Sequence, residues 1–104
     1  MEIIHYDKQN LEELLKNDLV ILDFYADWCG PCQMLSEDLE IIATERTAGL
    51  IVKINVDKHQ NIATKYGVMS IPNIYIYKNN KELTHFVGYK SAEEINDLIK
   101  VNDN

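Results

Sequence analysis

Two almost uninterrupted apolar runs, residues 19–26 and residues 50–56, dominate the hydrophobic pattern of the chain. Runs of this length without polar alternation are typical of strands that are buried on both faces of a sheet. Between the runs, apolar residues recur at helical spacing, so we expect a helix that follows Pro31 and ends near Gly49. The order strand, helix, strand predicts a right-handed parallel crossover.

Shorter elements are predicted around this crossover. Residues 2–5 form a candidate edge strand, and Asp7 is a candidate cap for a helix that reaches about residue 17. After the second apolar run, residues 57–60 resemble a capping box that opens a short helix closed by Gly67.

The last third of the chain predicts a hairpin and a final helix. Residues 73–77 and 82–87 are strand-like, and the two asparagines between them tolerate the positive φ of a tight turn. Ser91 and Glu94 have the spacing of a second capping box. The whole succession predicts an α/β fold in which helices cover both faces of a mixed sheet, while periodicity alone leaves the strand order open.

Both cysteines of the chain fall in one short string, Trp28-Cys29-Gly30-Pro31-Cys32, between the first buried run and the helix. Cysteines three apart on a first helical turn face the same side, with Cβ atoms about 5 Å apart. A disulfide can close over that distance after a small adjustment. Cys29 also lies where unpaired backbone N–H groups and the helix dipole stabilise a thiolate, which is the nucleophile of disulfide exchange. The string therefore predicts a reactive dithiol, with Cys29 as the more exposed thiol.

Two other interpretations of the cysteine pair are an inert disulfide and a metal site. In a protein that is not secreted, two cysteines favour redox catalysis or metal binding over a structural framework. A four-coordinate zinc site needs more ligands than one pair supplies, and His5, His59 and His85 are scattered singly. We therefore expect no metal.

A carboxylate interrupts the first apolar run at Asp23, and Lys53 interrupts the second. A buried carboxylate must be paired, protonated or functional, because its desolvation is costly. Burial raises the pKa of an aspartate, and a group that titrates nearer neutrality can transfer a proton. The alternative is a plain ion pair between Asp23 and Lys53 on neighbouring strands. The two roles are compatible, with Lys53 tuning Asp23.

Composition narrows the choice of function. The 104 residues are enough for one domain, and a hydrophobic content of 46% with two prolines argues against disorder. A formal net charge of -7 disfavours nucleic acid and anionic membranes as partners. No apolar stretch approaches the roughly 20 residues of a membrane span. The first residues lack the pattern of a secretory signal, so we expect a cytoplasmic protein.

The dithiol string, preceded by a strand that carries Asp23, resembles the thioredoxin family. Lys53, Ile71-Pro72 and Gly88 follow in the order and approximate spacing of that family, so the resemblance extends along nearly the whole chain. It implies the thioredoxin fold over residues 1–104, a central mixed sheet with helices on both faces. It also implies a protein-disulfide reductase that cycles between dithiol and disulfide.

The resemblance assigns roles to single residues. Cys29 would attack a client disulfide and Cys32 would resolve the mixed disulfide, while Asp23 would take the proton of Cys32. The proline matching Pro72 is cis in the family and faces the dithiol, leaving the backbone of Ile71 for an extended substrate segment. An apolar patch around Cys29 would consist of Trp28, Gly30, Pro31, Ile71, Pro72 and Gly88. The competing interpretation makes Trp28 and Ile71 core residues and Gly88 the end of a strand.

The resemblance also implies partners. A flavin-containing, NADPH-linked thioredoxin reductase would supply electrons, so FAD and NADPH would act only indirectly and the chain itself, a monomer, would hold no cofactor. Peroxiredoxins, methionine sulfoxide reductases and ribonucleotide reductase are the expected kinds of client. One rival function is a disulfide oxidase or isomerase, but relatives of that type typically carry a histidine where Gly30-Pro31 stands. The other rival is a binding module with an incidental dithiol.

Several positions depart from the family pattern. Gln33 stands where a lysine is frequent, and Ser36-Glu37 stands where a proline usually kinks the helix, so we expect a straighter helix. Ser70, Asn73 and Tyr89 replace the usual smaller or different residues near the patch. We expect these changes to affect the choice of partner and to leave the chemistry intact.

Overall fold

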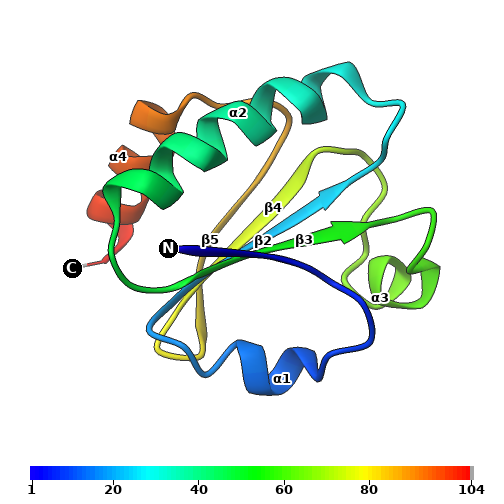
Figure 1. Cartoon of the computed structure of the whole chain (residues 1–104), viewed down its shortest axis with the longest axis horizontal. Coiled ribbons are helices and arrows are strands. Elements are labelled where there is room, and N and C mark those ends of the chain that lie inside the picture. The colour runs from blue at the N-terminus through cyan, green and yellow to red at the C-terminus, as the bar shows by residue number, and fades with distance from the viewer. Residues whose placement is uncertain (104) are drawn as a thin grey trace.

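The computed structural model describes residues 1–103 and contains a five-stranded mixed sheet with helices on both faces (Figure 1). The elements in chain order are β1 (Glu2–His5), α1 (Leu11–Leu14), β2 (Leu19–Tyr25), α2 (Gly30–Glu45), β3 (Leu50–Asn55), α3 (Gln60–Lys65), β4 (Asn73–Lys78), β5 (Lys81–Val87) and α4 (Ala92–Asn102). The strand order in the sheet is β1-β3-β2-β4-β5. This arrangement confirms the predicted fold class.

Strand β2 lies at the centre of the sheet. It pairs with β3 in parallel and with β4 in antiparallel orientation, which confirms the predicted parallel arrangement of the two apolar runs. Both runs are buried, as predicted. The register places Asp23 directly beside Lys53 on β3 and Ile74 on β4. The two charged interruptions of the apolar runs are therefore neighbours across one strand pair.

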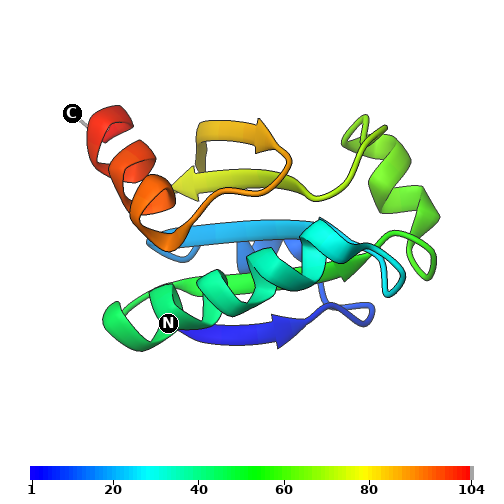
Figure 2. The same ribbon diagram turned by 90° about the horizontal axis from the view of Figure 1, so that it is seen from above.

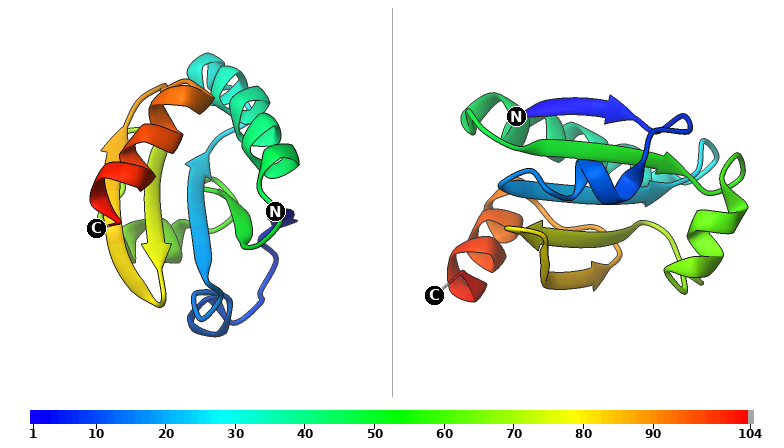
Figure 3. Two further views of the ribbon diagram at one scale, coloured as in Figure 1. Left: turned by 90° about the vertical axis from the view of Figure 1, so that its left-hand side faces the viewer. Right: turned by 90° about the horizontal axis from the view of Figure 1, so that it is seen from below.

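The two faces of the sheet carry separate cores. Side chains alternate along a strand, so Val20, Leu22 and Phe24 pack toward α1 and α3, while Ile21 packs toward α2 and α4. Figure 2, seen from above, shows α2 and α4 in front of the sheet, and the right-hand view of Figure 3, from below, shows α1 over the opposite face. By the same alternation Asp23 faces α2, which begins at the dithiol.

Two predicted helix starts are wrong. Asp7 caps no helix: Lys8 has a φ of 72°, and α1 begins later, where Oδ1 of Asn10 accepts a hydrogen bond from the backbone N–H of Glu13 at 3.2 Å. Residues 57–60 form no capping box, because α3 starts at Gln60 without a side-chain cap. In both cases the carboxylate lies before the first helical turn, so it is too early in the chain to cap the helix.

Helix α2 ends earlier than predicted. It stops at Glu45, and Arg46 is already extended with φ −101° and ψ 137°. Gly49 belongs to the connection to β3, where its φ is 106° and an added Cβ would lie 2.5 Å from the carbonyl oxygen of Leu19. Glycine at this position therefore permits a close approach to β2 and does not end the helix.

The hairpin and the last capping box are confirmed. Asn79 and Asn80 have φ values of 51° and 67° between β4 and β5. The Ser91 hydroxyl accepts from the backbone N–H of Glu94 at 3.1 Å, and the Glu94 carboxylate accepts from the N–H of Ser91 at 3.0 Å. No helix within residues 1–103 is both long and apolar enough to cross a membrane.

Candidate functional site

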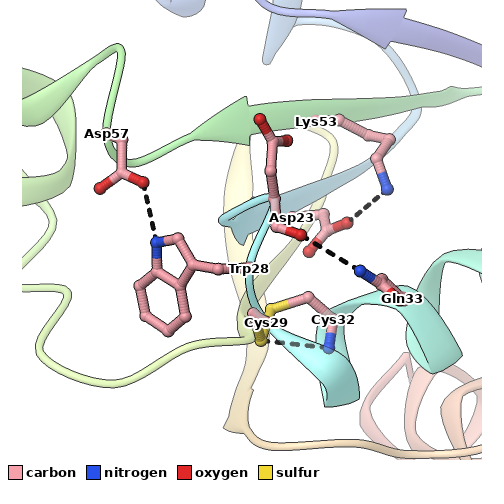
Figure 4. The surroundings of a disulfide bond; sticks show 8 residues. Asp23, Trp28, Cys29, Cys32, Gln33, Lys53 and Asp57 are labelled. Carbon is pink, nitrogen blue, oxygen red and sulfur yellow. Dashed lines mark hydrogen bonds and ion pairs between the residues drawn. A yellow bond between two sulfur atoms is a disulfide. The ribbon is translucent and has the colours of Figure 1, made fainter.

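The two cysteines form a disulfide at the start of α2, with their Cα atoms 5.2 Å apart (Figure 4). Cys29 is the N-cap residue of the helix, and its sulfur accepts a hydrogen bond from the backbone N–H of Cys32 at 3.2 Å. Pro31 fits the first turn because the N–H groups there have no partner within the helix. The same N–H groups and the helix dipole stabilise negative charge on the Cys29 sulfur when the disulfide is opened.

The two cysteines of this disulfide are almost equally buried, so burial does not show which of them attacks a client. Cys29 is 5% exposed and Cys32 is 3% exposed, so the expected difference in exposure is very small. Both pack with Ala26 and the partly buried side chain of Ile71. The chemical distinction between them comes from position, since only Cys29 lies at the N-cap.

Asp23 and Lys53 form a buried ion pair on the α2 side of the sheet. Nζ of Lys53 lies 3.1 Å from Oδ2 of Asp23, while Oδ1 of Asp23 is buried and has no hydrogen-bond partner within residues 1–103. Burial raises the pKa of the Asp23 carboxyl, and the charge and hydrogen bond of Lys53 act in the opposite direction more weakly. The carboxyl can therefore exchange a proton at a higher pH than an ordinary aspartate.

A third polar group in this cluster was not predicted as functional. The hydroxyl of Ser36, one helical turn after Cys32, accepts a hydrogen bond from Nζ of Lys53 at 2.8 Å. The Lys53 ammonium also lies 4.9 Å from the ring centre of Tyr25. The helical spacing from Cys32 would have placed Ser36 on the relevant face, but no pattern in the sequence indicates that Lys53 reaches it.

The expected substrate-facing residues lie in different environments. The Ile71–Pro72 peptide bond is cis, as expected from the resemblance, and the carbonyl of Pro72 accepts from the N–H of Gly88 at 2.8 Å. Trp28 is 72% exposed and is therefore no core residue. Its indole N–H donates to Asp57 at 3.0 Å, a contact that the sequence did not predict (Figure 4). In Figure 4 Trp28 lies on one side of the disulfide and Lys53 on the other.

Met69 was also missed by the sequence reasoning. It precedes Ile71 by two residues, and its side chain is 95% exposed. An exposed methionine adds adaptable apolar surface close to the expected patch. Its only signal in the sequence is its proximity to Ile71-Pro72.

The departures from the family pattern have structural partners. Asn73 is buried and its Oδ1 lies 2.6 Å from Nε2 of His85. The Tyr89 hydroxyl donates to Asp38 on α2 at 2.7 Å. Helix α2 runs without interruption from Gly30 to Glu45, and the straighter helix expected in the absence of a kinking proline stays a prediction. Within residues 1–103, no three His, Cys, Asp or Glu side chains are grouped as metal ligands.

Comparisons with known proteins agree with this geometry. Residues 2–101 match the family model described as Thioredoxin. The chain is 41% identical to a thioredoxin of Chlamydia caviae over 91 residues, which are 88% of this chain and 89% of that protein. It is 39% identical to a thioredoxin of Bacillus subtilis over 100 residues, 95% and 96% of the two chains. Among solved structures, a mutant thioredoxin from Halobacterium salinarum superposes with a TM-score of 0.86 at 36% identity, covering 99% of this chain and 92% of that chain.

Proposed function

This chain belongs to the thioredoxin family, and from that premise we propose that it reduces protein disulfides by cycling Cys29 and Cys32 between dithiol and disulfide. The observation that carries the proposal is the position of Cys29 at the N-cap of α2, bonded to Cys32. Cys32 lines the same cavity as Lys53, the ion-pair partner of the buried Asp23 carboxyl. In the reduced protein this position stabilises the Cys29 thiolate.

The reaction consists of two exchange steps. The Cys29 thiolate attacks one sulfur of the client disulfide, forms a mixed disulfide and displaces the other client sulfur as a thiolate, which takes a proton from water. Cys32 then loses its proton and attacks the Cys29 sulfur. The second client thiolate leaves, and the Cys29–Cys32 disulfide forms. Two electrons pass from the dithiol to the client.

Asp23 is the proposed proton acceptor for Cys32. Its buried carboxyl has a raised pKa and an unpaired Oδ1 among residues 1–103, which are the properties of a group that can take a proton at a higher pH than an ordinary aspartate. Lys53 tunes this group, because its charge favours the ionised form. This assignment gives the buried pair a function in the release step.

Clients are proposed to bind over the apolar patch around Cys29. The backbone of Ile71 makes no hydrogen bond to another residue within 1–103, so it is available to an extended client segment. Pro72 follows Ile71 directly, and Gly88 donates its backbone N–H to the carbonyl of Pro72 at 2.8 Å. A Cβ added at Gly30 would meet nothing within 4 Å, so the start of α2 is open there.

The proposed partners follow from family membership. We propose that a thioredoxin reductase carrying FAD and using NADPH returns the disulfide to the dithiol, and that the chain itself, as a monomer, binds no cofactor. Peroxiredoxins, methionine sulfoxide reductases and ribonucleotide reductase are the proposed kinds of client, and the cytoplasm is the proposed location.

A trapping experiment tests the function. Cys32→Ser removes the release step, so cell extract treated with this variant should show mixed disulfides on non-reducing gels that dithiothreitol dissolves. Cys29→Ser is the matched control and should trap little. Identical patterns for the two variants would contradict the exchange mechanism, and a double Cys→Ala variant that retains full function would favour a binding module.

The identity of the attacking thiol has its own test. Iodoacetamide at neutral pH, applied to the reduced protein and followed by peptide mapping, should label Cys29 first because the helix N-terminus stabilises its thiolate. Preferential labelling of Cys32 would reverse the assignment.

A further inference from the structure

Lys53 is held by two hydrogen-bond acceptors that come from different layers of the fold. Its Nζ lies 2.8 Å from Oγ of Ser36 on α2 and 3.1 Å from Oδ2 of Asp23 on β2. The ammonium therefore connects the helix that carries the dithiol to the central strand that carries the carboxyl group. Of the two acceptors, only Ser36 belongs to the helix.

The side chain of Lys53 also borders open space. Its side chain lines a cavity of about 240 Å³ together with His5, Tyr25, Cys32 and Ser36. A lysine ammonium is strongly hydrated and sits on a flexible four-carbon chain, so water competes with the protein for it. The ammonium stays in its inner position, between Ser36 and Asp23, only if its hydrogen bonds and the charge of Asp23 outweigh the lost hydration.

We propose that Ser36 is a positioning residue for the release step, whose hydroxyl keeps the ammonium of Lys53 against Asp23. This inference rests on the proposed function, in which Asp23 accepts the proton of Cys32. Ser36 touches neither sulfur in the step; it acts through Lys53.

The direction of the effect follows from the geometry. Without the hydroxyl, the inner position of Lys53 loses one of its two hydrogen bonds, so the ammonium spends more time in water. Asp23 then has less opposing charge and holds its proton to a higher pH. If Ser36 instead drew the ammonium away from Asp23, removing the hydroxyl would tighten the ion pair and lower that pH.

The other titratable residues around the cluster are the same in every variant of this test. Besides Asp23 and Lys53 they are Tyr25 on β2, His5 on β1, Asp27 after β2 and Cys32 on α2. None of them is altered by a change at position 36. Ser36→Ala is also compatible with folding, because alanine is the best helix former.

The direct test is an NMR titration of the Asp23 side-chain carboxyl carbon in the oxidised protein, with the signal assigned through Asp23→Asn. In Ser36→Ala the midpoint should rise by about half a pH unit or more, a threefold change in the ionisation constant. Ser36→Thr keeps the hydroxyl and should titrate like the wild type. Thr44→Ala removes another hydroxyl from the same helix, one that bonds Glu40 of α2 itself, and should have no effect.

Three results would overturn the inference: an unchanged midpoint in Ser36→Ala, a lowered midpoint, or an equal shift in Ser36→Thr. The rate of insulin reduction against pH gives a second reading, because the acid limb for Ser36→Ala should move to higher pH while the alkaline plateau stays. A wild-type protein that reduced no insulin would refute the proposed function instead, and the titration would still decide whether Ser36 holds Lys53 on Asp23.

Discussion

Two lysine–carboxylate pairs in this protein have similar distances and opposite surroundings. Lys53 and Asp23 approach to 3.1 Å with side chains 9% and 0% exposed, whereas Lys16 and Glu13 approach to 2.9 Å with side chains 61% and 64% exposed. The surface pair loses little hydration and is screened by water and salt. The buried pair interacts strongly, but both charges have left water. Distance alone therefore says little about what a pair contributes.

This difference in burial gives the two pairs different effects on stability. Burial raises the pKa of Asp23 more than Lys53 lowers it, so the native state holds the charged carboxylate at a cost in stability. A surface pair carries no comparable cost. A costly charged group on the sheet face that α2 and its dithiol cover is understandable if its titration serves the release step.

The largest effect should come from removing the buried cation. Lys53→Met leaves Asp23 without a counter-charge in the core, so at alkaline pH we expect a loss of about 3–5 kcal/mol in the free energy of unfolding. The loss should shrink toward acid pH, where Asp23 is protonated. Urea denaturation across pH measures it, and Asp23→Asn in the same background should restore most of the stability. An equal loss at all pH values would show that packing of the lysine chain dominates.

A helix cap should give an intermediate effect. Ser91 accepts the N–H of Glu94 at the exposed start of α4, a hydrogen bond that needs no buried charge. Ser91→Ala should lower the unfolding free energy by about 1 kcal/mol. Thermal denaturation measures it against Ser91→Thr as the control, and a loss as large as that of Lys53→Met would contradict the ranking by burial.

The smallest effect should come from the surface pair. Lys16→Met makes the same substitution as in the core, but Glu13 is left in water, so we expect a change of about 0.5 kcal/mol or less. Denaturation at low and high salt measures it, and the small difference from wild type should vanish at high salt. A salt-independent loss above that size would show that exposure is a poor guide to the contribution of an ion pair.

The sequence predicted the parts of the fold that depend on local chemistry. The apolar runs of β2 and β3, the asparagine turn and the capping box of α4 are all confirmed, because each depends on residues within a few positions of one another. The caps predicted at Asp7 and Asp57 are wrong because local spacing was the only basis for them. Sequence spacing cannot show whether a carboxylate caps a helix. The helix after Asp7 begins only at Leu11, and the Asp57 carboxylate accepts a hydrogen bond from the distant Trp28.

The composition of the site was predictable only in part. Cys29, Cys32 and the facing pair of Asp23 and Lys53 follow from the string and from the crossover. The Ser36 contact depends on how far the Lys53 side chain reaches from β3 to α2, and this is set by packing between layers. The contact of Tyr89 with Asp38 on α2 is hidden from the sequence for the same reason.

We propose that Asp23 is kept in the core for proton transfer at a cost in stability. Its folded pKa is raised above the unfolded value of about 3.9, so between these two values the native state binds more protons than the unfolded state. Stability therefore falls as pH rises through this window, and the full cost is present above the folded pKa. Asp23→Asn keeps the shape of the side chain and removes both its charge and its titration.

The most direct measurement combines urea denaturation of Asp23→Asn and wild-type protein across pH with insulin reduction by both. We predict that the variant has the higher denaturation midpoint at mildly alkaline pH, that this advantage shrinks toward acid pH, and that disulfide reduction is slower because Cys32 has lost its proton acceptor. A variant that is less stable at every pH and reduces insulin at the wild-type rate would show that Asp23 is only the ion-pair partner of Lys53.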